Sequence, residues 1–263
     1  MKQKLSLKQC LQWAILKILK EQPLTVDECY RLLEKQLPPP PQPGSLNRKY
    51  SIYKLRTYLK GLEEQGEIIS AKDSELLSYS ITKKGYEREK ARGKELQERV
   101  RVVNHALNVI LESLIGRNPI TPKIVPDEDR EFVRSLLSVK DIIRVYILRY
   151  LSNNKQAALS DIQRDMISEW GWTCSKTYFL LIGRNEMTEG LDEDNEPLEN
   201  PTILLTSTYT GQASRKHKRE YSIVDKNLAT EWSEIYLESA IYSLREAITF
   251  TDTIIALLEK NPS

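Results

Sequence analysis

One basic amphipathic stretch, residues 45–69, constrains the fold of this chain more than any other segment. Three leucines, Leu55, Leu59 and Leu62, recur at the spacing of a single helix face. Gly66 follows as a residue suited to ending a helix, and a strand is expected from the next residue. The opposite helix face carries the basic, tyrosine and threonine residues Lys49, Tyr50, Tyr53, Thr57 and Lys60, and Arg56 lies on its flank. Such a face is typical of a helix that contacts DNA bases and phosphates.

The segments around this stretch predict two preceding helices and a following β-hairpin. Apolar spacing predicts a first helix from about residue 7 to residue 21. A capping box formed by Thr25 and Glu28 is expected to open the second helix. After the basic helix, alternating residues at 67–71 and 76–82 predict a short hairpin. Three helices followed by a hairpin are the order of a winged helix-turn-helix domain, in which the hairpin is the wing.

A heptad seam follows on a helix expected at about 83–116. Its apolar residues are spaced alternately four and three residues apart: Leu96, Val100, Val103, Leu107, Ile110 and Leu114. A seam of this kind needs an apolar partner, either a second copy of the chain or the other half of the same chain. We expect a homodimer, which makes these six residues candidate dimerisation contacts.

The second half of the sequence repeats the order of the first half. Helical patterns at 139–151 and 175–188 correspond to the first helix and to the basic helix. A capping box is expected at 160–163, and the run Tyr-Ser-Ile at 221–223 repeats the one at 79–81. This repeated order predicts an internal duplication.

The expected fold class is therefore mostly α with small β wings (α+β). Two winged helix-turn-helix domains, at 1–116 and 139–263, are expected to be joined by long amphipathic helices. The first domain would end with the heptad helix and the second with a helix at about 226–260. The segment 117–138 is expected to be a linker.

The charges are unevenly distributed along the chain. Residues 1–120 hold 22 Lys and Arg against 14 Asp and Glu, whereas the remainder holds 17 against 23. This asymmetry favours a first half that faces nucleic acid, although an ordinary charged surface would give the same count. A second basic cluster falls at the tip of the second expected wing, and its candidate DNA contacts are Arg215, Lys216, Lys218 and Arg219. The alternative for this cluster is a solvated loop.

Catalytic and metal-binding chemistry finds little support in the sequence. The two histidines, His105 and His217, accompany no nucleophile motif, no phosphate-binding glycine loop and no metal-spaced Cys/His cluster. We therefore expect no enzymatic activity, no cofactor and no metal. No apolar run approaches the roughly 18 residues that a membrane span requires, and no export signal is recognised. Three scattered cysteines suit a reducing compartment, so a cytoplasmic location without membrane contact is expected.

Two short motifs, LKGLEEQG at 59–66 and YSITKKG at 79–85, connect the first half with a known group of proteins. On these residues it resembles the PadR-like branch of winged-helix transcriptional regulators. The resemblance covers about residues 5–114 and, weakly, 139–260. It implies DNA binding by a winged helix and dimerisation through the last helix of the domain, which suits the heptad seam.

The second half departs from this resemblance. Asn227 stands where Gly85 would align, and the run at 178–182 is apolar around most of its helix, which favours burial over insertion into a DNA groove. The leading hypothesis is a sequence-specific, double-stranded DNA-binding protein that acts as a dimeric transcriptional regulator. One alternative is a plasmid or phage replication or partition protein. Another is an architectural subunit, similar to the tandem winged-helix partners of bacterial condensins, whose helices contact protein rather than DNA.

Overall fold

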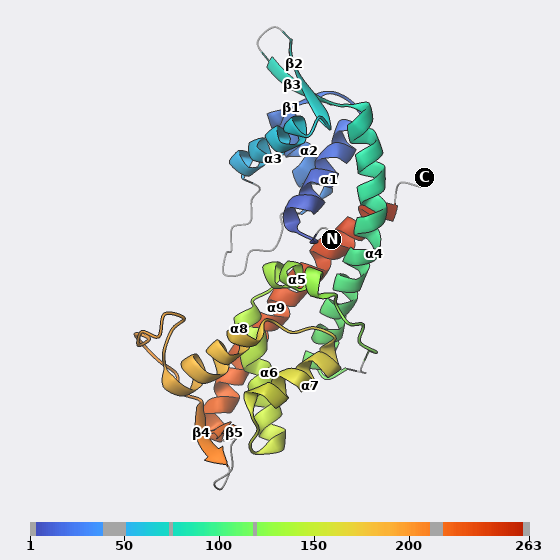
Figure 1. Cartoon of the computed structure of the whole chain (residues 1–263). Coiled ribbons are helices and arrows are strands. Elements are labelled where there is room, and N and C mark those ends of the chain that lie inside the picture. Colours follow the sequence, from blue (N-terminus) through green and yellow to red (C-terminus); the bar gives the residue numbers. More distant parts are fainter. Residues whose placement is uncertain (1–3, 39–50, 74–75, 118–119, 211–217, 260–263) are drawn as a thin grey trace. The chain divides into compact units, whose positions relative to one another are not determined.

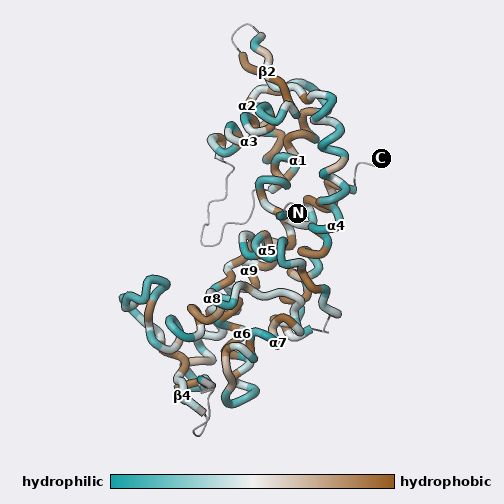
Figure 2. The backbone as a smooth tube through the Cα atoms, in the orientation of Figure 1, coloured by the Kyte–Doolittle hydropathy of each residue, from teal (hydrophilic) through white to brown (hydrophobic). Residues whose placement is uncertain are grey.

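Most of the chain forms helices, and two small antiparallel sheets accompany them (Figure 1). This computed structural model describes residues 4–38, 51–73, 76–117, 120–210 and 218–259. The expected class, mostly α with small β elements, is confirmed at this level. Hydrophobic and hydrophilic residues alternate along the helices in Figure 2, as expected for elements that bury one face.

The chain divides into two compact units, and each is assembled from separated segments. Unit 1 comprises Met1–Leu107, Pro126–Leu136 and Glu246–Ser263. Unit 2 comprises Asn108–Val125 and Leu137–Arg245. The expected division into one N-terminal and one C-terminal domain therefore differs from the observed one, in which the last part of the chain joins the unit that the first part forms.

The segment 117–138, which was expected to be a linker, has structure of its own. It contains a 3-10 turn, η1 (Asp127–Asp129), and helix α5 (Arg130–Leu136). The buried residues of α5 are Phe132, Val133 and Leu136. Burial of three large apolar side chains makes this segment part of a hydrophobic core rather than a spacer.

In its described residues, the N-terminal segment of unit 1 has three helices and a three-stranded sheet, followed by a long helix that continues into unit 2. The elements are α1 (Leu7–Leu19), β1 (Leu24–Thr25), α2 (Val26–Gln36), α3 (Ile52–Glu64), β2 (Ile68–Asp73), β3 (Leu76–Ile81) and α4 (Lys83–Leu114). The sheet has the order β1-β3-β2 and is antiparallel throughout. The expected capping box is confirmed, because the Thr25 hydroxyl accepts from the Glu28 backbone N–H and the Glu28 carboxylate accepts from the Thr25 N–H.

Unit 2 has helices of its own and a two-stranded sheet. The elements are α6 (Val139–Asn154), α7 (Leu159–Trp170), α8 (Lys176–Leu180), a π-helical continuation η2 (Leu181–Glu189), β4 (Leu205–Thr210), β5 (Lys218–Ile223) and α9 (Lys226–Glu259). Helix α9 runs on into the part of the chain that belongs to unit 1. The capping box expected at 160–163 is wrong: α7 begins at Leu159, and its N-cap Ala158 provides no side-chain hydrogen bond.

The two units repeat the same strand register. In unit 1, Tyr79 lies between Ser70 on β2 and Leu24 on β1. In unit 2, Tyr221 lies between Ser207 on β4 and Ala157, which forms an isolated bridge where unit 1 has β1. This correspondence extends the repeat from the order of the elements to the pairing of individual residues.

The two units also repeat the helix that precedes each hairpin. Ser51 caps α3 and Ser175 caps α8, each by accepting a hydrogen bond from the backbone N–H three residues later. Each helix leads to a glycine fifteen residues after its capping serine, Gly66 and Gly190, with φ of 68° and 70°. Glycine adopts this left-handed conformation with little strain, so the helical segments of both units end at the same position.

Candidate nucleic-acid interface

Helix α3 presents the exposed polar face that the sequence predicts. Its three leucines are at most 2% exposed, and the other side of the helix is open to solvent. On that side Tyr53 is 77% exposed, and Arg56, Thr57 and Lys60 are also exposed. Two further predicted contacts, Lys49 and Tyr50, lie outside the described residues.

The cations of α3 differ in how far they are neutralised. Lys60 faces Glu64 at 3.9 Å, but both side chains are largely exposed, so this pair contributes little. Lys54 and Arg56 have no ion pair within the described part of the chain, and both are exposed. Lys54 was not among the residues predicted from the sequence, although it lies on the flank of the helix, as Arg56 does. These cations can contact phosphates or base edges.

The junction between α3 and the hairpin is held by the residues of the YSITKKG motif. The Thr82 hydroxyl lies 2.8 Å from the Gly66 carbonyl oxygen and 3.0 Å from the Glu67 carbonyl oxygen, and it accepts from the Gly85 backbone N–H. Lys84 donates to the carbonyl oxygen of Gln65, at the end of α3. The motif therefore fixes the angle at which the hairpin leaves the helix.

A buried ion pair reinforces this junction from α4. The Glu67 side chain is fully buried and accepts two hydrogen bonds from Arg92, at 2.8 and 2.9 Å. Arg88 lies 3.6 Å from the same carboxylate. A bidentate guanidinium compensates the desolvation of a buried carboxylate. This ion pair thus holds the end of α3 against α4.

The helix of unit 2 that corresponds to α3 has a different surface. Counted from the capping serines, Leu180 and Leu181 occupy the positions of Arg56 and Thr57, and both are half-buried. A Cβ on Gly183 would lie 2.7 Å from a Leu159 methyl group, so this helix packs closely against α7. Its apolar surface is part of the packing of unit 2. Of the basic residues of α3, only Lys60 has a basic counterpart here, Arg184, which lies 3.3 Å from the carboxylate of Glu189.

Arg219, which was expected to contact DNA, belongs to an intramolecular network. Its guanidinium donates to Glu189 and to the Ser207 hydroxyl, each at 2.9 Å, and it lies over the ring of Tyr221. The side chain is only 21% exposed. This placement argues against the predicted DNA contact, since its charge is already compensated. Arg215 and Lys216 lie outside the described residues, as does the side chain of Lys218.

The Arg219–Glu189 pair predicts a specific acid sensitivity. The hydrogen bond from Arg219 lowers the pKa of Glu189 below its ordinary value. The pair therefore stabilises the fold fully above the usual Glu pKa of about 4.3, and this contribution is lost as the pH falls through the lower, folded-state pKa. Between about pH 6 and about pH 3, the wild-type protein should lose more thermal stability than Glu189→Gln. Equal losses in the two proteins would contradict this assignment.

The heptad seam on α4 is buried within a single chain. Its six residues, Leu96, Val100, Val103, Leu107, Ile110 and Leu114, are each at most 4% exposed. In unit 1, Asn104 beside the seam donates to Thr251 and Asp252 of α9, and in unit 2 Arg149 donates to the carbonyl oxygen of Ser113 on α4. The six side chains therefore provide no exposed dimerisation surface, and of the two partners considered for the seam, the structure supports the same chain.

Shortening one seam residue should affect folding and leave association unchanged. We expect Ile110→Val to lower the free energy of unfolding by about 1 kcal/mol, because the lost methylene leaves a small cavity in a filled core. The loss should be the same at every protein concentration, as measured by urea unfolding over a hundredfold dilution series. A loss that grows on dilution would instead place Ile110 between two copies of the chain.

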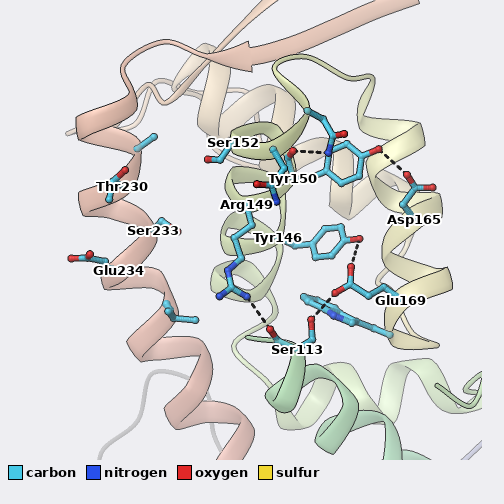
Figure 3. Close-up of a pocket in the computed structure, with 15 residues that line it drawn as sticks. Ser113, Tyr146, Arg149, Tyr150, Ser152, Asp165, Glu169, Thr230, Ser233 and Glu234 are labelled. Carbon is cyan, nitrogen blue, oxygen red and sulfur yellow. Dashed lines mark hydrogen bonds between the residues drawn. The ribbon is translucent and has the colours of Figure 1, made fainter. Parts of the chain in front are cut away.

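One cavity of about 760 Å³ in unit 2 is bordered by α6, α7, α9 and the end of α4 (Figure 3). Tyr146 and Tyr150 point from α6 toward α7, where their hydroxyls donate to Glu169 and Asp165 at 3.0 and 2.7 Å. Burial is the main cause that raises the pKa of Tyr146. Both tyrosines therefore stay protonated at neutral pH and act as donors. The carboxylates of Glu169 and Asp165 are therefore engaged in hydrogen bonds that hold α6 against α7.

The described residues hold no cluster of three or more His, Cys, Asp or Glu side chains placed to bind a metal. Cys10, Cys29 and Cys174 are buried free thiols. Burial raises the pKa of both Cys10 and Cys29 to about 12, which leaves them unreactive as thiolates at neutral pH. Among the described helices, none has both the length and the apolar character needed to cross a bilayer.

Comparison of the chain with protein-family models, curated proteins and solved structures found no match. Any functional conclusion therefore rests on the geometry of the chain itself.

Proposed function

We propose that this chain binds double-stranded DNA through α3, in a winged-helix arrangement formed by unit 1. The element order α1-β1-α2-α3-β2-β3 and the sheet order β1-β3-β2 support the proposal. In that arrangement α3 is the recognition helix and the β2–β3 hairpin is the wing. Unit 2 has a similar order of elements, but its counterpart of α3 is apolar. We therefore do not assign it a second recognition helix.

The exposed face of α3 is the observation that carries this proposal. Arg56 and Lys54 are cations without an ion-pair partner within the described residues, and Tyr53 beside them is 77% exposed. Guanidinium and ammonium groups bind phosphates, and a guanidinium can also bind the edge of guanine. Such a row on one rigid helix, next to a protruding hairpin, suits the major groove of a duplex.

The biological role that we propose is transcriptional regulation by occupation of an operator. A replication or partition protein would bind DNA with the same helix, but it would select repeated sites, whereas a dimeric regulator would select a palindrome. The homodimer remains a prediction to which no surface is assigned, since the α4 seam is buried. The cytoplasmic location also remains a prediction.

An architectural role in which unit 1 contacts protein is the second candidate. The exposed apolar residues of the hairpin favour it, because uncharged side chains are common at protein interfaces. Selection from random 40-base-pair duplexes, followed by sequencing, separates the candidates. Enrichment of one motif supports the DNA-binding function, and its arrangement distinguishes a regulator from a replication protein. A lack of any retained duplex at about 50 mM salt, where phosphate contacts are strong, would contradict DNA binding and favour the architectural role.

A further inference from the structure

Helix α9 carries two apolar seams within unit 2, and one of them is exposed. The inner seam is buried and contains Ala229, Tyr236, Ala240 and Leu244. The outer seam, as we call it, consists of Leu228, Trp232, Ile235 and Tyr242. Leu228 is 37% exposed, Ile235 50% and Tyr242 55%, and Trp232 is half-buried. A row of exposed apolar side chains on one helix marks a candidate interaction surface.

The spacing of the outer seam indicates what kind of element it contacts. With Ser239 in the remaining place, its members are four, three, four and three residues apart. The seam of α4 has the same heptad spacing, and such a seam packs against another helix, whose side chains enter the holes between its own. The α4 seam is buried within the chain, whereas the outer seam of α9 stays open to solvent. The expected contact is therefore a helix.

The internal repeat shows that the fold does not require large apolar side chains at these positions. Tyr79 corresponds to Tyr221 by strand register, so Trp232 and Ile235 correspond to Lys90 and Gly93 of α4. Neither of the α4 residues is large and apolar. The tryptophan and isoleucine of α9 thus point to contact with another molecule.

Acidic side chains line one border of the outer seam. Three glutamates at this border are exposed and form no ion pair among the described residues: Glu231, Glu234 and Glu238. Arg245 lies at the C-terminal end of the same border. On the other border, Arg144 of α6 lies over the Tyr236 ring, but its charge is compensated by Glu186. A border with uncompensated acids favours a partner with positive charge.

We propose that the outer seam binds a basic amphipathic helix of another protein, with apolar residues at heptad spacing and Lys or Arg beside them. The apolar side chains of that helix pack between the four members of the seam, and its cations face the glutamates. Tryptophan and tyrosine often dominate the affinity of such contacts. A second copy of α9 fits less well, because an antiparallel pair places the same glutamates against each other. The surface belongs to unit 2 and does not depend on DNA binding by α3.

Two synthetic peptides of three heptads each test this surface. Both carry leucine at the seam positions, and the flanking positions hold lysine in one peptide and glutamate in the other. Trp232 reports binding, because the other three tryptophans, Trp13, Trp170 and Trp172, are buried. The lysine peptide should shift the Trp232 emission to shorter wavelength and bind with a Kd of about 10–100 µM, as suits a small interface. The glutamate peptide should bind at least about tenfold more weakly at low salt.

A variant in the middle of the seam separates seam contact from simple charge attraction. Ile235→Ser should weaken binding of the lysine peptide by about tenfold or more. Because Ile235 is half exposed, its thermal unfolding midpoint should stay within a few degrees of the wild type. Ile124→Ser is the matched control, since Ile124 is 70% exposed in unit 2 but lies outside α9. It should bind the peptide as the wild type does.

A second pair of variants tests the acidic border. Glu231→Gln combined with Glu238→Gln should reduce the difference in affinity between the two peptides to about threefold or less. The matched control combines Glu193→Gln with Glu199→Gln, two exposed glutamates of unit 2 that lie outside α9. It should keep the wild-type difference.

Several results would overturn the proposal. They are equal binding of the two peptides by the wild type, no binding of the lysine peptide at about 1 mM, or unchanged binding by Ile235→Ser. A wild-type dimer in sedimentation that Ile235→Ser abolishes would also overturn it, because a second copy would then occupy the seam. All of these variants should bind duplex DNA as the wild type does, so a failure here leaves the proposed function standing, and the reverse also holds.

Discussion

Replacement of Arg56 and Lys60 by alanine is expected to lower the affinity for duplex DNA by about a hundredfold, or roughly 3 kcal/mol. Each side chain lies on the exposed face of α3, where a single base or phosphate contact contributes about 1–3 kcal/mol. The fold itself should change little, since the Arg56 side chain makes no ion pair in the described part of the structure and the Lys60–Glu64 pair is solvated. Fluorescence anisotropy with a labelled duplex measures the loss.

A matched control separates a specific contact from a general loss of positive charge. Arg164→Ala on α7 of unit 2 removes one guanidinium, whose side chain is 70% exposed. Its affinity for DNA should fall by less than about threefold at physiological salt, where distant charges are screened. Similar losses for the two proteins would show that α3 has no special part in binding.

Replacement of Gly85 by alanine is expected to destabilise unit 1 by about 3 kcal/mol or more. A Cβ at this position would lie 1.9 Å from the carbonyl oxygen of Glu67 and 2.8 Å from a side-chain carbon of Ile81. A backbone oxygen cannot move aside without breaking its hydrogen bond with the Thr82 N–H. The junction between α3 and the hairpin would then open, so DNA binding should fall together with stability.

Gly61→Ala provides the control for this prediction, because Gly61 lies within α3 and the nearest atom to its added Cβ would be 3.7 Å away. Alanine is a better helix former than glycine, so this variant should gain about 0.5–1 kcal/mol. Urea unfolding followed by circular dichroism measures both variants. A Gly85→Ala protein within about 1 kcal/mol of the wild type would contradict the close packing of α4 on Glu67.

Local features of this chain follow well from its sequence. The spacing of Leu55, Leu59 and Leu62 identifies the buried face of α3, since helical periodicity depends only on neighbouring residues. Gly66 also ends the α3 segment as expected, with a positive φ. The hairpin was expected at 67–71 and 76–82 and forms at Ile68–Asp73 and Leu76–Ile81, a shift of one or two residues.

Long-range features could not be derived in the same way. A heptad pattern predicts that Leu107 packs against an apolar partner. It does not distinguish another chain from a distant part of the same chain. A basic run likewise looks the same whether its members are solvated or paired, and the partner of Arg219, Glu189, is thirty residues away in sequence. The exposure of the hairpin leucines could not be predicted either, because the alternation of residues along a strand does not show how far the neighbouring strands extend.

Binding of the wild-type chain to duplex DNA across a salt series tests the central claim most directly. Lys54, Arg56, Lys60 and Lys72 are four exposed cations on α3 and the hairpin. If each contacts a phosphate, the logarithm of the binding constant should fall with the logarithm of salt concentration with a slope of about −3 to −4. The α3 double-alanine variant should reduce the slope by about 2. Undetectable binding at low salt, or a slope near zero, would contradict DNA recognition by α3.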